Sequence, residues 1–485
     1  MSKKLIITLA AVIGIITSLM IPATVSAEPT IIEVWPGQSI QDAVIAANPG
    51  DTILVHSGVY HQSVFIPKPG ITLQGESGTI LDGNYPADDD TFLGINAITL
   101  AGSGITVEGL TIKHYNKEEP GDPKPKMGTG IVLMVSSAEC HIQNNHIKIG
   151  LIGITIGSQN NRIESNNIKG IDLGIGITPS ASGNLVQDNT AFGCHTGIGI
   201  GGTNNQVKRN KVTGPTIEGI GLFLAATGNN VSENEVEGTT QNGIALTDGV
   251  NGNTLNGNYV SNSGHNGIML LNAHNNHVMD NHVDNSGFNG IAVQDGAAGN
   301  VVTGNHITNS GIDAGGGIML ANAHGNLVAD NHVTSSTDPG ISIEGSGNQI
   351  QRNKVSRSNS DGIALFPTAN NNLVEGNKVT GSGAGGIALH GNAQDGSSSN
   401  EVLDNHVRDS NLDGIVMIGA ATANLIQNNK VSESDWSGIA TRMGASGNTI
   451  QENHVIKSGE FDLFDDPPAL NNVWQGNKYK TSNFP

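Results

Sequence analysis

The segment that decides the fold of this chain is Asn326-Leu327-Val328-Ala329-Asp330-Asn331-His332-Val333. It contains the phrase V-x-x-N-x-V, which the sequence repeats, with variations, fifteen times. The steps between copies run from 21 to 28 residues, a period typical of a stacked repeat. The asparagine inside the phrase recurs at Asn145, Asn166, Asn189, Asn210, Asn234, Asn258, Asn281, Asn305, Asn331, Asn353, Asn377, Asn405, Asn429, Asn453 and Asn477.

A second phrase, G-I-x-[LIV], follows the same period from Gly130 to Gly438. The apolar residues around both phrases alternate, which predicts three short, half-buried strands in each period. Stacked on the next period, each strand would pair in parallel with its copy ~4.8 Å away. An asparagine amide both donates and accepts, so the repeated asparagines are expected to bond to one another and to the turn backbone. Asn276, which lies outside this row, is expected at the surface.

These repeats and their row of asparagines resemble the right-handed parallel β-helix of the pectate-lyase superfamily, over roughly residues 30–480. We therefore expect an all-β protein, a right-handed single-stranded parallel β-helix with about 15 regular turns. That scaffold carries lyases, hydrolases, epimerases and plain binders, so the resemblance implies the fold and leaves the activity open. The alginate-epimerase motif D-P-H-D is not met by Asp338-Pro339-Gly340-Ile341.

The 485-residue chain carries 23 Lys and Arg against 43 Asp and Glu, a formal net charge of −20. This balance argues against nucleic acid as a partner, because phosphate backbones bind basic surfaces. The sequence has 66 glycines and only 4% aromatic residues, as expected of many tight turns. A solenoid accommodates this length without one large core, since each turn contacts only its neighbours.

The N-terminal stretch has the pattern of a signal peptide, with Lys3 and Lys4 before an apolar run and a small-residue cleavage site at Val25-Ser26-Ala27. We expect a secreted, periplasmic or cell-surface protein with no later membrane span. Ser39 to Ala47 predicts a short capping helix with Ser39 as its N-cap. The predicted segments are a signal peptide at 1–27, an N-terminal cap and first turns at 28–127 with a loop insertion at 116–127, regular turns at 128–457 and a C-terminal cap at 458–485.

Trp474 and Tyr479 are expected to cover the apolar interior of the last turn. The two cysteines, Cys140 and Cys194, occupy different places in the repeat. We therefore expect them on different sides of the coil, beyond the reach of a disulfide.

One outward column follows the repeated asparagine, and it carries His or Lys in nine consecutive turns. In an acidic chain such a stripe predicts a grip on a linear polyanion, or histidines presented to a metal. The structural alternative is that these long side chains cover the sheet while their tips reach Asp280, Asp330 and Asp404. The column reads His282, His306, His332, Lys354, Lys378, His406, Lys430, His454 and Lys478.

Two further columns flank the G-I phrase and predict a catalytic patch. Asp361 and Asp413 both precede its Gly and would lie two turns apart, roughly 9–10 Å at the usual strand spacing. This is near the upper end of the separation for two carboxylates of an inverting glycosidase. His390 would lie between them, with Glu344 and Arg442 on the same face. The structural alternative is ordinary turn chemistry, because Asp before Gly is common in turns.

The widened loop from Gly391 to Asn400 is expected to form a wall beside this patch. In the functional hypothesis, the two aspartates act on the sugar, His390 accepts a proton or holds charge, and Arg442 clamps a sugar carboxylate. No protein metal site is predicted, and calcium is the one cofactor left open.

The sequence thus predicts an exported β-helix that binds or modifies an acidic polysaccharide, as a polyuronide lyase, epimerase or hydrolase. The rival hypothesis is a non-catalytic surface or assembly protein, including a metal-delivery factor. A carboxylate pair in a walled cleft would favour the enzyme, and an open, evenly decorated rod would favour the binder. The oligomeric state does not follow from the sequence.

Overall fold

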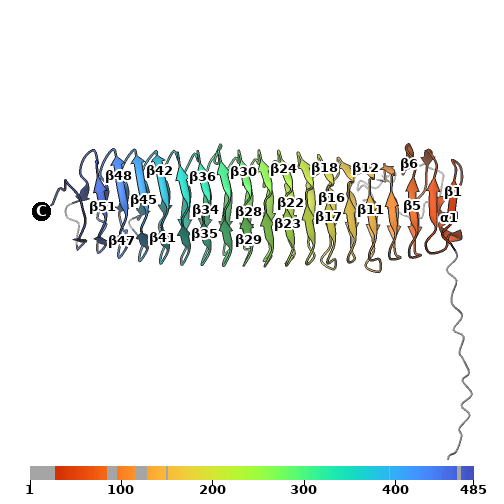
Figure 1. Ribbon diagram of the computed structural model, residues 1–485, viewed down its shortest axis with the longest axis horizontal. Helices are drawn as coiled ribbons and strands as arrows, with labels where there is room; N and C mark the ends of the chain where they lie inside the picture. Colours follow the sequence, from red (N-terminus) through yellow and green to blue (C-terminus); the bar gives the residue numbers. More distant parts are fainter. Residues whose placement is uncertain are drawn as a thin grey trace, which may run out of the picture.

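A computed structural model describes residues 28–84, 96–115, 128–148, 151–392, 394–466 and 471–484. The described chain winds into an elongated rod whose coils stack along one axis (Figure 1). The proposed signal peptide and the 116–127 insertion lie outside the described residues. Within the described residues, no helix has the length and apolarity that crossing a membrane requires.

Three parallel sheets run along the rod and together form the expected parallel β-helix. Sheet A has 19 strands, from β1 (Ile31–Val34) to β53 (Val473–Gln475). Sheet B runs from β3 (Gly58–Tyr60) to β51 (His454–Ile456), and sheet C from β4 (Val64–Ile66) to β52 (Leu463–Asp465).

Sheets B and C show about 17 coils, slightly more than the 15 expected. The difference arises at the N-terminal end, where the coils of β3, β6 (Thr79–Asp82) and β9 (Thr111–Lys113) lack the repeated asparagine. These coils pair in the same parallel register as the later ones, so strand pairing extends beyond the asparagine row.

A middle coil shows how the apolar core is built. Its strands are β35 (Leu327–Ala329), β36 (His332–Thr334) and β37 (Ile341–Glu344). Val328, Val333 and Ile343 point inward from these three strands and are fully buried. In the next coil they face Ile350, Val355 and Leu365 in register, so each inward position forms a continuous apolar column.

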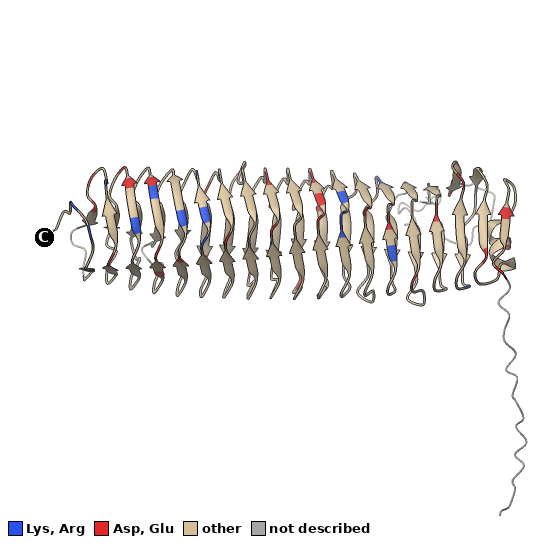
Figure 2. Cartoon of the chain, viewed as in Figure 1, with Lys and Arg blue, Asp and Glu red and all other residues tan. Residues whose placement is uncertain are grey.

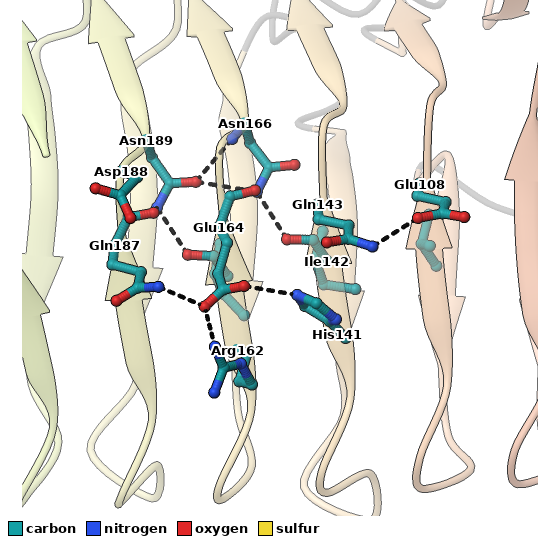
Figure 3. A network of polar contacts seen from close by, with 12 residues as sticks. Glu108, His141, Ile142, Gln143, Arg162, Glu164, Asn166, Gln187, Asp188 and Asn189 are labelled. Atoms are coloured by element: carbon teal, nitrogen blue, oxygen red, sulfur yellow. Dashed lines mark hydrogen bonds and ion pairs between the residues drawn. The ribbon is translucent and has the colours of Figure 1, made fainter.

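The repeated asparagines form the predicted ladder. Asn331 Nδ2 donates to the carbonyl of Val302 and to Oδ1 of Asn353, both at 2.9 Å. Its Oδ1 accepts from the backbone N–H and the Nδ2 of Asn305, both at 2.9 Å. Figure 3 shows the same contacts between Asn166 and Asn189. One buried amide therefore satisfies groups on both neighbouring coils.

A second asparagine ladder runs along the opposite end of sheet A, and the V-x-x-N-x-V phrase does not include it. Asn326, the first residue of the segment quoted above, belongs to it and donates to Asn348 Oδ1 at 3.1 Å. Asn276 is also a member, fully buried and bonded to Asn300, so its expected surface position is wrong. The row comprises Asn161, Asn184, Asn205, Asn229, Asn253, Asn276, Asn300, Asn326, Asn348, Asn372, Asn400, Asn424, Asn448 and Asn472.

The Gly of the G-I phrase is required by close packing. A Cβ built on Gly340 would lie 2.2 Å from Cγ1 of Val355 and 2.8 Å from the carbonyl oxygen of Gly362 on the next coil. It would also lie 2.7 Å from the hydroxyl of Ser358. Only glycine fits between the corner and the following coil.

Both ends of the rod are covered. At the N-terminal end, α1 (Ile40–Ala46) buries Ile40 and Val44, and the hydroxyl of its N-cap Ser39 accepts from the Asp42 N–H at 3.0 Å, as predicted. At the C-terminal end, Trp474 and Phe484 pack on the core with ring centroids 5.0 Å apart. Tyr479 is 42% exposed, so its expected covering role is wrong, and Phe484 takes that place.

The two cysteines are unpaired, as expected, and both are buried. Outside the core, polar contacts connect neighbouring coils along sheet A. Glu164 accepts from His141 at 2.9 Å and from Arg162 and Gln187, both at 2.6 Å (Figure 3). Outward side chains in register therefore contact one another from coil to coil.

We expect Asn331→Leu to lower the free energy of unfolding by about 1–3 kcal/mol, because the buried Asn305 N–H loses its acceptor and the bonds from Nδ2 to Val302 and Asn353 are lost. Chemical denaturation of the purified chain measures this difference. The matched control is Asn167→Leu, at an exposed position on β15 (Asn167–Lys169). Equal losses for the two variants would contradict a structural role of the buried ladder.

Candidate functional site

The predicted catalytic residues lie on the outer face of sheet C in the predicted register. Glu344 ends β37 and pairs with Ala321 of the preceding coil. His390 ends β43 (Ile387–His390) and pairs with Ile418. Ile418 pairs in turn with Arg442, the last residue of β49 (Ile439–Arg442). The outward column read from the sequence is therefore confirmed as a row of adjacent positions.

A cleft of about 380 Å³ opens on this face and gathers part of the predicted set. Glu344, Asp361 and His390 line it, whereas Asp413 and Arg442 do not. The complete lining is Asn289, Gly315, Gly316, Met319, Leu320, Asp338, Pro339, Ser342, Glu344, Ser360, Asp361, Phe366 and His390.

Asp361 and His390 form a hydrogen bond at the wall of the cleft. Asp361, 6% exposed, accepts the Gly385 N–H through Oδ1 at 2.8 Å, and its Oδ2 lies 2.8 Å from His390 Nε2. Phe366 stacks on the imidazole with ring centroids 5.3 Å apart. The ring is thus held at its edge and on its face, and Nδ1 is the nitrogen left to exchange a proton.

Asp413 makes a separate contact. Its carboxylate binds the Arg442 guanidinium through two hydrogen bonds of 2.7 Å, and its Oδ1 also accepts the Ser437 N–H at 3.0 Å. These bonds raise the pKa of Arg442, with Asp413 as the main cause. Arg442 is therefore engaged by a protein carboxylate, which argues against its expected role as a clamp for a sugar carboxylate.

The aspartates before Gly share a structural task with asparagines of earlier coils. Asn289 accepts the Gly316 N–H through Oδ1 at 3.0 Å, as Asp361 accepts that of Gly385. Turn chemistry thus accounts for one oxygen of Asp361. The second oxygen of Asp361 contacts His390, and turn chemistry does not require this contact.

The expected wall formed by the loop after His390 is not seen. Gly391 and Gly396 pair in an antiparallel bridge, and Gly396 lies against Ala420 of the next coil. None of the described residues of this loop lines the cleft. The cleft is instead bounded by side chains of preceding coils, among them Met319 and Asp338.

The charge of the cleft limits its chemistry. Among the described residues, its charged lining consists of Asp338, Glu344, Asp361 and His390, with no Lys or Arg. In the same part of the chain, no three or more His, Cys, Asp or Glu side chains converge as a metal site would require. The carboxylates and the histidine of the cleft can exchange protons, so proton transfer is the chemistry that this arrangement supplies.

The basic column is confirmed on sheet B as a continuous row. His282 pairs with His306, His306 with His332, and His332 with Lys354, and the row continues through Lys378, His406 and Lys430. Figure 2 shows the basic positions recurring on neighbouring strands in the C-terminal half. Sheet B and the cleft of sheet C are different faces, so this column does not border the cleft.

The tips of the column do not reach the aspartates expected to bind them. Asp330 instead binds Arg352 through bonds of 2.9 and 2.8 Å. Within the described part of the chain, Lys354, Lys378 and Lys430 are exposed and form no ion pair. These three cations, of which Lys354 and Lys378 lie on adjacent coils and Lys430 lies two coils beyond Lys378, are thus available to an external anion.

Neighbouring histidine rings of the column contact one another. His282 and His306 are stacked with ring centroids 5.0 Å apart, and His306 and His332 meet edge to face at 4.8 Å. Burial lowers the pKa of His306, with His282 as a further cause, and burial followed by Lys354 lowers the pKa of His332. These two imidazoles therefore gain charge only below the ordinary histidine range.

Asp338 also lines the cleft, although the sequence did not predict it as a site residue. The segment Asp338-Pro339-Gly340-Ile341 departs from the D-P-H-D motif and therefore gave no catalytic signal. Asp338 lies two residues before Gly340, the Gly of the G-I phrase in its coil, and lines the same cleft as His390. Its Oδ2 accepts the Gly315 N–H at 2.9 Å. In a later coil, the position two residues before the Gly of the G-I phrase is Trp436. The outward residues at this position form a further column, beyond those predicted from the sequence.

The family model described as a right handed beta helix region matches residues 94–260 and 249–396, which together span more than half of the chain. No curated protein matches the sequence. Among solved structures, an alginate lyase from Paenibacillus sp. str. FPU-7 is 17% identical, covers 52% of this chain and 94% of its own, and has a TM-score of 0.37.

Two further structures are similar at this level. The periplasmic alginate epimerase AlgG is 11% identical, with 83% of this chain and 84% of its own covered and a TM-score of 0.40. The N-terminal fragment of the bacteriophage Phi29 gene product 12 is 10% identical, with 88% and 87% covered and a TM-score of 0.48. At these identities the likenesses concern the fold alone.

Proposed function

We propose that this chain, which belongs to the right-handed β-helix family, is an exported polysaccharide-processing enzyme whose reaction takes place in the cleft on sheet C. The observation that carries the proposal is the Asp361–His390 pair, because a buried carboxylate fixes the imidazole at the wall of a cleft. A carboxylate in this position stabilises the imidazolium that forms when the ring accepts a proton.

In this mechanism His390 is the general base and Glu344 the proton donor. When Nε2–H is held by Asp361, Nδ1 removes a proton from a water molecule or from the sugar. Glu344, exposed at the cleft, would protonate the departing glycosidic oxygen. Elimination from a uronate needs its carboxylate neutralised, and the cleft lining has no Lys or Arg. Among lyase, epimerase and hydrolase, this charge pattern favours hydrolysis.

We expect His390→Gln and Asp361→Asn each to lower turnover by ~100-fold or more, because each removes one member of the proton-accepting pair. Asp361→Asn keeps the oxygen that accepts the Gly385 N–H, as Asn289 does in its own coil, so the fold is retained. The measurement is incubation with a panel of polysaccharides, with and without calcium, reading reducing ends and the absorbance of unsaturated products.

The matched control is His277→Gln, an exposed histidine on β29 (His277–Met279) of sheet A. Retained activity in His390→Gln would sink the catalytic assignment. Unsaturated products would identify a lyase and contradict the preference for hydrolysis drawn from the acidic cleft.

A second candidate function is non-catalytic retention of an acidic polysaccharide along the basic column. The observation in its favour is that the column presents exposed lysines in register and without internal ion pairs among the described residues. Neighbouring coils are ~4.8 Å apart, so these cations are spaced by one or two coil steps, which suits a linear polyanion lying along the rod. This candidate assigns recognition to sheet B and needs no reaction in the cleft.

We expect the triple change of Lys354, Lys378 and Lys430 to Gln to weaken retention on immobilised alginate or pectate at low salt. Binding of a polyanion takes up protons at His306 and His332, so retention by the wild type should tighten as the pH falls. Because both pKa values are lowered, the gain should begin below the ordinary histidine value of about 6.5.

The control replaces the same number of lysines at Lys148, Lys208 and Lys480, which lie off the column. Equal retention by the column variant and the wild type at low salt and at about pH 5.5, below the ordinary histidine value, would exclude the column as a polyanion site.

A further inference from the structure

An exposed tryptophan lies on the same face as the cleft. Trp436 is 44% exposed and occupies the row that also contains Ser360, a residue of the cleft. Backbone bonds connect this row from Ser360 through Ala384 and Leu412 to Trp436. Three coil steps correspond to roughly 14 Å at the usual strand spacing. In this row, the two side chains between the cleft and Trp436 are those of Ala384 and Leu412, both apolar.

The indole ring is supported from below by a fixed cation. The Arg442 guanidinium lies 5.2 Å from the ring centroid of Trp436 and 4.5 Å from that of Phe464. Asp413 holds this guanidinium through two bonds of 2.7 Å. Asp413 and Arg442, which the cleft does not use, thus position an aromatic surface.

Trp436 keeps much of its surface open to solvent. On the outer face of sheet C, Ala388, Val416 and Ala440 form a small buried cluster, and Ile418 and Phe464 are partly buried against it. Trp436 leaves 44% of its surface to solvent. Part of the indole ring is therefore accessible to a ligand.

We propose that Trp436 is a binding subsite that stacks a sugar ring of the polysaccharide chain whose reacting unit occupies the cleft. This inference rests on the proposed function, since it takes the same substrate along the same face. A sugar ring has an apolar C–H face, and a large aromatic ring supported from one side offers it a flat surface. The chain would lie parallel to the rod axis, crossing Ala384 and Leu412.

The consequence is a dependence on substrate length. A polymer that spans the cleft and Trp436 gains the stacking contact, whereas an oligosaccharide confined to the cleft does not. Trp436 lies two coils beyond the coil of His390 and would contact a sugar ring other than the reacting one, so it contributes equally to binding of the substrate and of the transition state and leaves the chemical step unchanged.

The experiment compares the wild type with Trp436→Ala and Trp436→Phe on a polysaccharide that the wild type cleaves. We expect Trp436→Ala to raise KM about five- to ten-fold, the effect of ~1–1.4 kcal/mol, with kcat unchanged. Trp436→Phe should restore most of the affinity, because it retains an aromatic face. Short oligosaccharides should be processed alike by all three proteins.

The matched control is Trp35→Ala, a tryptophan that is 52% exposed at the N-terminal end of the rod. An unchanged KM in Trp436→Ala, or an equal rise in Trp35→Ala, would overturn the inference. Affinity electrophoresis in gels containing the same polysaccharides separates this result from failure of the proposed function. Retention that is lost only in Trp436→Ala supports the subsite even without turnover, and absence of retention in the wild type overturns it.

Discussion

A side-chain amide that donates and accepts at the same corner of successive coils is the interaction on which the regular part of this structure depends. Asn377 donates to Asn405 Oδ1 at 3.0 Å and to the Ile350 carbonyl at 2.8 Å, so a single side chain connects neighbouring coils. These groups are buried, and an unpaired one would cost about 1–3 kcal/mol. Two such ladders, at the two ends of sheet A, hold the polypeptide in nearly identical turns.

The ladders matter for function because they maintain the register. With each coil held against the next, an outward position stays in one row along the rod, and a slip of one residue would turn that row inward. The pairing of His390 with Ile418, and of Ile418 with Arg442, is a direct result. Contacts between coils then become possible for residues distant in sequence, such as Asp361 and His390.

The same register separates charge between faces. Sheet B presents a row of His and Lys, while the cleft of sheet C is lined by carboxylates and one histidine. Beside the basic row, Asp330 binds Arg352. The two functions proposed above, retention of an anion and proton transfer to a sugar, therefore concern different faces of the rod.

The sequence by itself determined the coil, the first ladder and the identity of the outward columns. These follow from periodicity, because each turn contacts only its neighbours and a position in the repeat is a position in space. The asparagines of the second ladder, such as Asn326, recur with the same period and could have been predicted in the same way. They lie outside the phrase V-x-x-N-x-V, which defined the repeat. The capping helix from Ser39 followed from local signals alone.

Only the tertiary structure decided which members of a column act together. Asp361 and Asp413 are alike in sequence, each before Gly, and both brace the next coil through Oδ1. Their second oxygens meet different side chains, His390 and Arg442, which arrive from the following coil. Side-chain direction and the depth of a cleft depend on neighbours one coil away, and periodicity does not specify them.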